Sequence, residues 1–407
     1  MVSNARSFGL LCLHCFFAFA ALGTHLPYLA LFLRENIGLT SSQVGLVVAI
    51  PPLVGLFAQP AWGQLADRTG SRVRVLFLLC LGASAGFVGL SQAHGLAGAV
   101  AATLALALFL SALFSLSTSV ILGALASPSH FGRVRAWGTI GYLVVVVASP
   151  RALAWLQGPR TMLPPAGGPS EPALPWLFCF AACCLLVAGA SVALLPRRTS
   201  LSVRSRKGDL HALLSQPAFR RVLVFFVGIQ LFLHGPMQLF PLYVRSRGGS
   251  MTEISNLWIC MLALEIPLIF GSARVFASVG VTRMMRIAAL SGGLRWVVCA
   301  LVPTLPGVYA VQVLHAVVVT GLMVGTALYV EQIVPARLRA TAQGTVVMLG
   351  SSVGGVLSSA LGGLVLERFG VDWLYLTFGL GAVGWALTGR SLLVPDAVSG
   401  RRLNLWP

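Results

Sequence analysis

The sequence is built from long apolar runs that are separated by short polar stretches. An α-helix needs about 20 mostly apolar residues to cross the roughly 30 Å hydrocarbon core of a bilayer. Runs of this kind occupy approximately 8–33, 43–63, 74–92, 97–125, 136–156 and 175–195, and then 219–243, 254–276, 284–303, 307–332, 341–366 and 371–394. The pattern predicts an all-α membrane protein with twelve transmembrane helices in two six-helix bundles.

Composition supports a membrane-embedded chain. Charged residues make up only 9% of the 407 residues, whereas soluble domains carry about 25%. The charge balance is basic, with 28 Lys and Arg against 10 Asp and Glu. A basic chain could bind nucleic acid, but these arginines punctuate apolar runs and form no single patch. The sequence therefore favours an integral, multi-pass protein whose partners are lipid and a small solute, with no nucleic acid.

The distribution of arginines predicts the topology. Basic residues gather on alternate connections, and the positive-inside rule places those connections and both termini in the cytoplasm. The most basic connection divides the runs into two groups of six. We expect an N-terminal bundle over 1–195, a cytoplasmic basic linker over 196–217, a C-terminal bundle over 218–394 and a cytoplasmic tail over 395–407.

The sequence offers little for enzymatic chemistry. All eight cysteines lie inside apolar runs, where a thiol behaves as a small hydrophobic group. Cys12 and Cys15 form a C-x-x-C pair, but no second ligand pair accompanies it. No metal-spaced histidine cluster or nucleophile–base set appears. We expect no metal site, no cofactor and no enzymatic activity, and a monomeric protein.

The sharpest motif is GQLADRTGSR, between the second and third predicted helices. Its glycines permit close backbone approach, and Asp67 can pair with a neighbouring arginine. The segment resembles the loop-two signature G-x-L-x-D-R-x-G-x-R of the major facilitator superfamily. The matching residues are Gly63, Leu65, Asp67, Arg68, Gly70 and Arg72. This resemblance implies a conformational latch between the cytoplasmic ends of the two halves. The second-half counterpart, GSARVFASVG, has Val275 where the acidic residue would stand.

Further segments narrow the resemblance to one branch of that superfamily. Four segments are similar to helices five, eight, ten and eleven of lactose-permease-like and phenylpropionate-permease-like proton symporters. In that order they are FGRVRAWGTIGY, WICMLALEIPLIF with Trp258 and Glu265, QVLHAV with His315, and ARLRATAQG. The Gly-rich antiporter signature of helix five is not reproduced, which counts against a drug/proton exchanger. The resemblance implies alternating access between two pseudo-symmetric bundles.

Two ionisable residues are candidates for proton coupling. Glu265 lies near the middle of an apolar run, where a charge costs about 2.5–3.5 kcal/mol and persists mainly for function or with a partner. Burial favours the neutral form of a carboxyl, so Glu265 is suited to binding and releasing a proton. His315 can also titrate near neutral pH. The alternative for both is a neutral side chain that is hydrogen-bonded inside the bundle.

Three further residues are candidates for substrate contact. Arg135 corresponds, by resemblance, to a substrate-binding arginine, although it could be an ordinary inner-loop arginine. His234 precedes Gly235–Pro236, where we expect a helix break that frees carbonyls. Trp258 could contact substrate or simply pack. His14 and His25 are weaker candidates, and we expect Arg295 either to snorkel or to find a partner in the bundle.

These observations predict a proton-coupled symporter that takes up a small organic solute. The acidic residue that lactose-type permeases keep on helix four is missing, which leaves Arg135 available for an anion. An aromatic or other carboxylate is the first candidate, followed by a nucleoside or a sugar. A proton-coupled efflux antiporter and a non-transporting membrane sensor remain alternatives.

Overall fold

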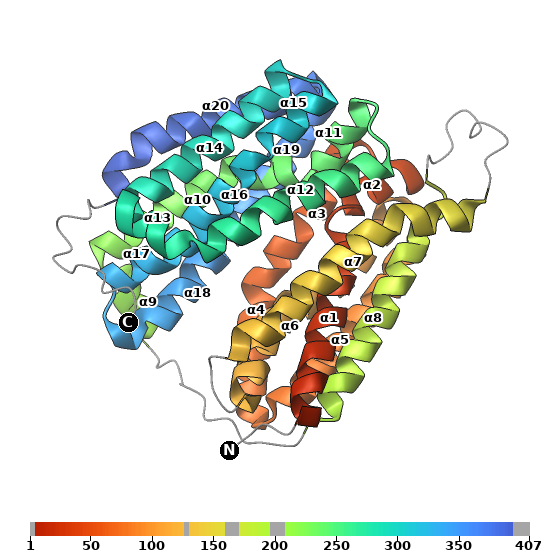
Figure 1. The fold of residues 1–407 in the computed structure, drawn as a ribbon, viewed down its shortest axis with the longest axis horizontal. Helices are drawn as coiled ribbons and strands as arrows, with labels where there is room; N and C mark the ends of the chain where they lie inside the picture. The colour runs from red at the N-terminus through yellow and green to blue at the C-terminus, as the bar shows by residue number, and fades with distance from the viewer. Residues whose placement is uncertain (1–4, 126–129, 159–170, 196–207, 394–407) are drawn as a thin grey trace. The chain divides into compact units, whose positions relative to one another are not determined.

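The computed structural model describes residues 5–125, 130–158, 171–195 and 208–393, and all regular structure in these ranges is helical (Figure 1). Within these ranges, eleven helical segments are long and apolar enough to cross a membrane. The twelfth predicted run forms α20 (Val371–Thr388), whose 18 residues fall just outside that set. At 1.5 Å per residue α20 is about 27 Å long, close to the bilayer core thickness. The prediction of an all-α membrane protein is confirmed.

The chain divides into two compact units, Met1–Val203 and Arg204–Pro407. The helices of the first unit are α1 (Ala5–His25), α2 (Leu29–Leu31), the π-helical η1 (Phe32–Asn36), α3 (Ser41–Val48), α4 (Ile50–Thr69), α5 (Arg72–Ser91), α6 (Gly95–Ala124), α7 (Phe131–Gln157) and α8 (Pro175–Ala193). Within this unit α1 packs against α7 and α8, and α5 packs against α6 and α8.

A glycine explains how closely α1 and α7 approach. A Cβ atom added to Gly141 of α7 would lie 2.1 Å from the Phe16 carbonyl oxygen of α1. No larger residue fits there unless the helices separate. In lipid, where apolar burial gives little drive for helix association, such close van der Waals contact is a main source of packing energy.

The second unit has more interrupted helices. They are α9 (Asp209–Leu214), α10 (Pro217–Gln238), α11 (Phe240–Ser246), α12 (Met251–Phe270), α13 (Ser272–Val279), α14 (Val281–Leu301), α15 (Leu305–Val311), α16 (Val313–Val319), η3 (Thr320–Val324), α17 (Gly325–Ile333), η4 (Ala336–Leu338), α18 (Arg339–Leu349), η5 (Gly350–Gly354), α19 (Gly355–Phe369), α20 and η6 (Gly389–Leu392). In this unit α14 packs against α16 and α20, α12 against α16, and α10 against α19.

Several predicted helices of the second unit are interrupted. The run 219–243 breaks at Leu239, between α10 and α11, and the run 254–276 breaks at Gly271. Gln312 separates α15 from α16, and the same span continues through η3. Single π-helical turns such as η3 and η5 are uncommon and often mark functional positions. Helix 10 of the predicted topology is therefore irregular where its candidate histidine lies.

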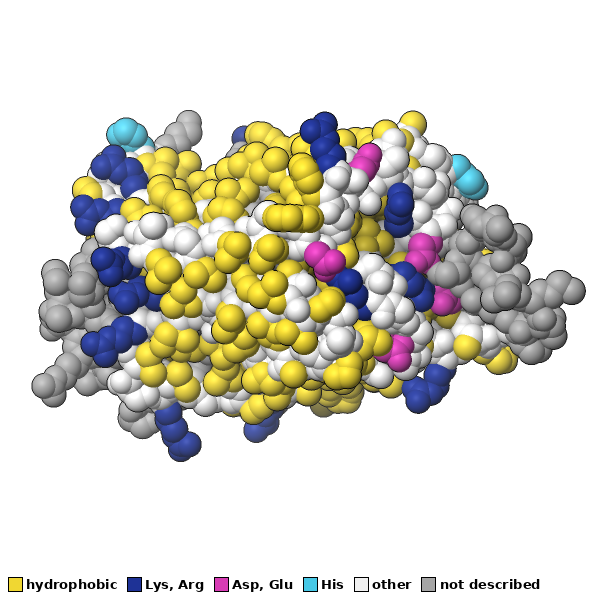
Figure 2. Space-filling view, turned by 90° about the horizontal axis from the view of Figure 1, so that it is seen from above, with side chains coloured by type: hydrophobic (Ala, Val, Ile, Leu, Met, Phe, Trp, Pro, Cys, Tyr) yellow, Lys and Arg dark blue, Asp and Glu magenta, His cyan; other side chains and the backbone are white. Residues whose placement is uncertain are grey.

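The surface agrees with a lipid environment. On the face drawn in Figure 2, hydrophobic side chains cover a broad area and many basic side chains gather toward the left end of the view. The basic linker residues 196–207 and the whole of the predicted tail, 395–407, lie outside the described residues. The remaining part of the linker includes α9, which is held by an ion pair between Asp209 and Arg337 at 2.9 Å.

Candidate functional site

A polar network lies inside the second unit, on three helices that pack together. Glu265 is on α12, Arg295 on α14, His315 on α16, and Gln312 at the junction of α15 and α16. His315 Nε2 lies 3.8 Å from Glu265 Oε2. His315 Nδ1 lies 3.0 Å from an Arg295 terminal nitrogen, and Arg295 Nε donates to Gln312 Oε1 at 2.9 Å. The two residues proposed for proton coupling are thus adjacent.

Burial changes along this network. Gln312 is 0% exposed and Arg295 is 2% exposed. The side chains of His315 and Glu265 retain 15% and 20% of their accessible surface. The network therefore runs from a fully enclosed guanidinium to a carboxyl that a small ion can reach. A carboxyl with this partial access is what reversible proton binding requires.

The hydrogen-bonding partners of His315 determine which tautomer it adopts. A guanidinium has only donors, so its contact with His315 Nδ1 requires a lone pair on that nitrogen. The neutral imidazole must then carry its proton on Nε2, which faces Glu265. The 3.8 Å separation is too long for a direct hydrogen bond and leaves the pair free to close. Arg295 thereby assigns the tautomer of the neighbouring histidine.

Arg295 is held mainly by weak or neutral partners. Its guanidinium lies 4.1 Å from the Trp296 ring centroid and 5.6 Å from that of Phe240. Its other terminal nitrogen faces the sulfur atoms of Met237 and Met261, at 3.7 and 3.6 Å. None of the ion pairs between described residues joins Arg295 to a carboxylate. Of the two outcomes expected for Arg295, snorkelling or a partner in the bundle, the structure shows the second, and the partners are the neutral side chains of Gln312 and His315.

Gln312 is a site residue that the sequence analysis missed. Its amide nitrogen donates to the Val308 carbonyl at 2.9 Å, which turns its carbonyl oxygen toward Arg295. The signal was present: a lone amide inside an apolar run, three residues before His315 and so on the same helix face. Glu265 was identified by its charge inside an apolar run, a criterion that a neutral amide does not meet.

The structure changes the interpretation of His234. The helix break expected at Gly235–Pro236 is wrong, because α10 runs on to Gln238. Side chains of α19 and α20 bind the backbone on either side of the Gly235–Pro236 peptide bond. The Gly235 N–H donates to Ser358 Oγ at 2.6 Å, and the Pro236 carbonyl accepts from the Tyr375 hydroxyl at 2.7 Å. The buried Nε2 of His234 has no hydrogen-bond partner among the described residues.

The remaining substrate candidates lie on different units. Trp258 is half-buried on α12, seven residues before Glu265 and therefore on the same helix face. Arg135 is half-buried in the first turns of α7, with its guanidinium 3.9 Å from the Phe19 ring centroid. Trp258 thus lies on the helix of Glu265, two turns before it, and Arg135 belongs to the first unit.

The glycine-rich motif forms a tight turn between α4 and α5. Gly70 ends α4 with a φ of 63°, a left-handed conformation that favours glycine. Asp67 pairs with Arg72 at 3.1 Å, and Arg72 also donates to Ser119 of α6 at 2.6 Å. Gly63 lines, with Asp67 and Arg72, a recess of about 190 Å³. Arg68 is exposed. The acidic residue of the motif is therefore tied to α5 and, through Arg72, to α6.

The weaker histidine candidates are enclosed in the first unit. His14 is 1% exposed; its Nδ1 lies 3.0 Å from the Ala188 carbonyl oxygen and its Nε2 lies 2.9 Å from Ser117 Oγ. His25 is 5% exposed and packs edge-on against Phe87. Both positions are those of packed histidines inside a bundle.

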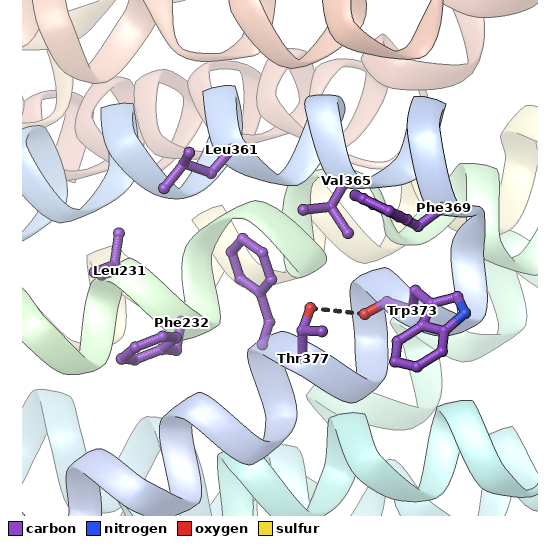
Figure 3. A pocket seen from close by; sticks show the side chains of 8 residues that line it. Leu231, Phe232, Leu361, Val365, Phe369, Trp373 and Thr377 are labelled. Carbon is purple, nitrogen blue, oxygen red and sulfur yellow. Dashed lines mark hydrogen bonds between the residues drawn. The ribbon is translucent and has the colours of Figure 1, made fainter.

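The second unit also carries an apolar groove that is separate from the network (Figure 3). It measures about 490 Å³ and is lined by Leu231 and Phe232 of α10, Leu361, Val365 and Phe369 of α19, and Trp373, Thr377 and Phe378 of α20. The hydroxyl of Thr377 donates to the Trp373 carbonyl of its own helix. Apart from this hydroxyl and the Trp373 indole N–H the lining is apolar, so the groove is poorly suited to a polar solute.

Comparisons with known proteins agree with this architecture. The family model described as "MFS_1 like family" matches residues 10–377. The chain is 30% identical over 377 residues to "Maltose permease" of Geobacillus stearothermophilus, covering 90% of this chain and 88% of that protein. It is 25% identical over 367 residues to "Putative sugar efflux transporter" of Deinococcus radiodurans, covering 86% and 88%.

Solved transporters share the fold at lower sequence identity. The nucleoside transporter NupG superposes with a TM-score of 0.82 at 16% identity, covering 95% of this chain and 98% of that one. An autoinhibited POT family peptide transporter gives a TM-score of 0.76 at 13% identity, with 99% of each chain covered. The predicted major facilitator fold is confirmed by these likenesses.

Proposed function

This chain belongs to the MFS_1 like family, and from that premise we propose that it is a proton-coupled symporter that takes up a sugar. A secondary transporter of the major facilitator type moves a small solute across the membrane by alternating access. The proton coupling, the direction and the solute are the parts that the proposal adds.

The observation that carries the proposal is the contact between Glu265 and His315 beside a buried Arg295. A carboxyl that is mostly buried but reachable can hold a proton in one state and release it in another. When Glu265 is ionised, the Nε2–H of His315 faces it as a donor. When Glu265 binds a proton, that contact weakens. Protonation therefore changes the attraction between α12 and α16.

Arg295 makes this change directional. His315 can accept a second proton only on Nδ1, the nitrogen that Arg295 occupies as a donor. A proton that arrives therefore rests on Glu265, unless Arg295 withdraws from the histidine. Movement of α14 relative to α16 would withdraw Arg295 from His315 and so let the proton leave Glu265 for the histidine. In this way proton binding and helix movement depend on one another.

The names of the sequence relatives support a sugar as the solute. The permease from G. stearothermophilus is named for maltose and the D. radiodurans protein for sugar efflux. Trp258 and Glu265 lie on one face of α12, two turns or about 10.5 Å apart, a spacing that one sugar could span with an apolar and a polar contact. A carboxylate is the second candidate, because a guanidinium such as that of Arg135 can bind a carboxylate through two hydrogen bonds.

The test is transport in proteoliposomes with an imposed inward proton gradient, using labelled maltose and, separately, labelled benzoate. We expect maltose to accumulate. Glu265→Gln should lower gradient-driven accumulation by about 100-fold, equivalent to about 2.7 kcal/mol, and should leave solute counterflow within about twofold. Glu331→Gln, a carboxyl on α17 outside the network, is the matched control and should behave as the parent.

Each alternative has its own outcome. Full accumulation by the Glu265→Gln variant would remove Glu265 from the coupling step. Accumulation of benzoate instead of maltose would leave the coupling intact and replace the solute. Solute leaving the vesicles in exchange for protons would indicate an antiporter. No flux with any sugar or carboxylate would favour a sensor.

A further inference from the structure

The partner of Arg295 is unusual for a buried cation in a membrane protein. An enclosed guanidinium is normally compensated by a carboxylate, because an unpaired charge in low dielectric costs several kcal/mol. Here the enclosing partner is the neutral amide of Gln312, which accepts from Arg295 Nε at 2.9 Å. The amide oxygen accepts a hydrogen bond from the guanidinium but does not neutralise its charge.

We propose that Gln312 is a positioning residue, whose neutral amide holds Arg295 in place while leaving the positive charge to act on His315 and Glu265. This inference rests on the proposed proton coupling and adds the residue that sets its strength. Gln312 touches neither solute nor proton. It acts through the guanidinium.

The orientation of Gln312 is fixed by its own helix. Its amide nitrogen donates to the Val308 carbonyl one turn earlier, at 2.9 Å. Gln312 is also the residue where α15 ends and α16 begins. At 0% exposure the side chain cannot exchange its partners for water. The carbonyl oxygen is therefore held toward α14, and with it the direction of the Arg295 fork.

The other groups around the guanidinium cannot supply the missing negative charge. Besides Glu265 and His315, the titratable side chains that the structure describes near it are Cys299 of α14 and Tyr375 of α20, and Tyr243 of α11 packs against Tyr375. Tyr375 donates to the Pro236 carbonyl, and Tyr243 donates to the Cys299 carbonyl at 2.6 Å. Phenols and thiols of this kind stay protonated at neutral pH. The charge of Arg295 thus remains directed at the histidine and the carboxyl beyond it.

The amide identity of residue 312 can be tested with two substitutions. Gln312→Glu would place a carboxylate on Arg295 and cancel its charge. Glu265 would then be less favoured as an anion and would keep its proton to higher pH. Gln312→Leu is similar in size and removes the acceptor but not the charge of Arg295.

The measurement is the pH profile of proton-driven maltose accumulation in proteoliposomes, with counterflow as the uncoupled reference. For Gln312→Glu we expect the alkaline midpoint to move up by at least about half a pH unit. For Gln312→Leu we expect about tenfold slower accumulation with the midpoint within about 0.3 unit of the parent. Infrared difference spectra, with Gln312→Glu in a Glu265→Gln background, report whether the introduced carboxyl is ionised.

Three results would overturn the positioning role: an unmoved midpoint in Gln312→Glu, an introduced carboxyl that stays protonated beside Arg295, or Gln312→Leu behaving as the parent. If Gln312→Glu does not fold, the Gln312→Leu result decides alone. The failure of the proposed function looks different. In that case the parent protein itself would show no dependence on the proton gradient.

Discussion

The two units treat buried polar side chains in different ways. In the first unit, His14 is bonded to the Ala188 carbonyl and to Ser117. The acidic residue of its glycine-rich motif, Asp67, stands at the predicted inner end of α4. In the second unit, Arg295 and Glu265 lie well inside their helices and are linked through His315. The first unit keeps charge near helix ends, and the second encloses it.

The difference suggests a division of labour between two units of nearly the same length. A charge inside the membrane is retained where a cycle makes use of it. A charge pair at a helix end costs little and can be broken and remade during movement. The second unit is thus suited to proton binding, and the first to holding or releasing a conformation. The counterpart of Asp67 in the second unit is Val275 of α13, which agrees with this division.

The largest effect should follow from removing the enclosed charge of the second unit. We expect Arg295→Gln to reduce proton-driven accumulation by about 100-fold. The substitution removes both the positive charge that acts on Glu265 and the guanidinium donor that selects the tautomer of His315. Arg295→Lys keeps a charge but loses the planar fork, so we expect a reduction of about tenfold. Accumulation and counterflow in proteoliposomes measure both. Equal activity of the two variants and the parent would show that enclosed charge does not distinguish the second unit.

A smaller effect is expected from the latch of the first unit. Asp67→Asn removes the ion pair with Arg72 and should slow solute cycling by about tenfold, with solute binding within about twofold of the parent. Stopped-flow exchange measures the rate, and calorimetric titration with maltose measures the binding. The matched control is Val275→Asp in the second unit, which should not restore the cycling rate when it is combined with Asp67→Asn. Lost binding in Asp67→Asn would contradict the latch.

The sequence predicted the helices well and their interruptions poorly. Apolar runs locate spans because the bilayer sets their length. The breaks at Leu239 and Gln312, and the π turns, depend on contacts between helices. Pro236 lies inside α10, where Ser358 accepts from the Gly235 N–H and Tyr375 donates to the Pro236 carbonyl. Neither partner could be assigned from the sequence alone, because the apolar pattern of a helix does not determine which of its residues face which neighbouring helix.

The site was predicted in part for a similar reason. Glu265 and His315 stood out as isolated ionisable residues in apolar runs, and the structure places them 3.8 Å apart. Arg295 carried the same signal, but its partner could not be named. Gln312 carried no charge, and its contact with Arg295 joins residues 17 positions apart on two helices. The sequence could identify charged members of the network; the neutral member required the fold.

The smallest effect should come from the buried histidine of the first unit. The hydroxyl oxygen of Ser117 lies 2.7 Å from the Leu113 carbonyl oxygen and 2.9 Å from His14 Nε2. Ser117→Ala removes one hydrogen bond between helices, which in membranes contributes about 0.6 kcal/mol on average. We therefore expect a small loss of thermal stability and no change in the pH profile of accumulation. The structural role of His14 requires this result, because a neutral histidine bonded to a carbonyl takes no part in proton binding. A shift in the profile as large as that of Gln312→Glu would mean that the first unit also titrates, and the contrast between the two units would fail.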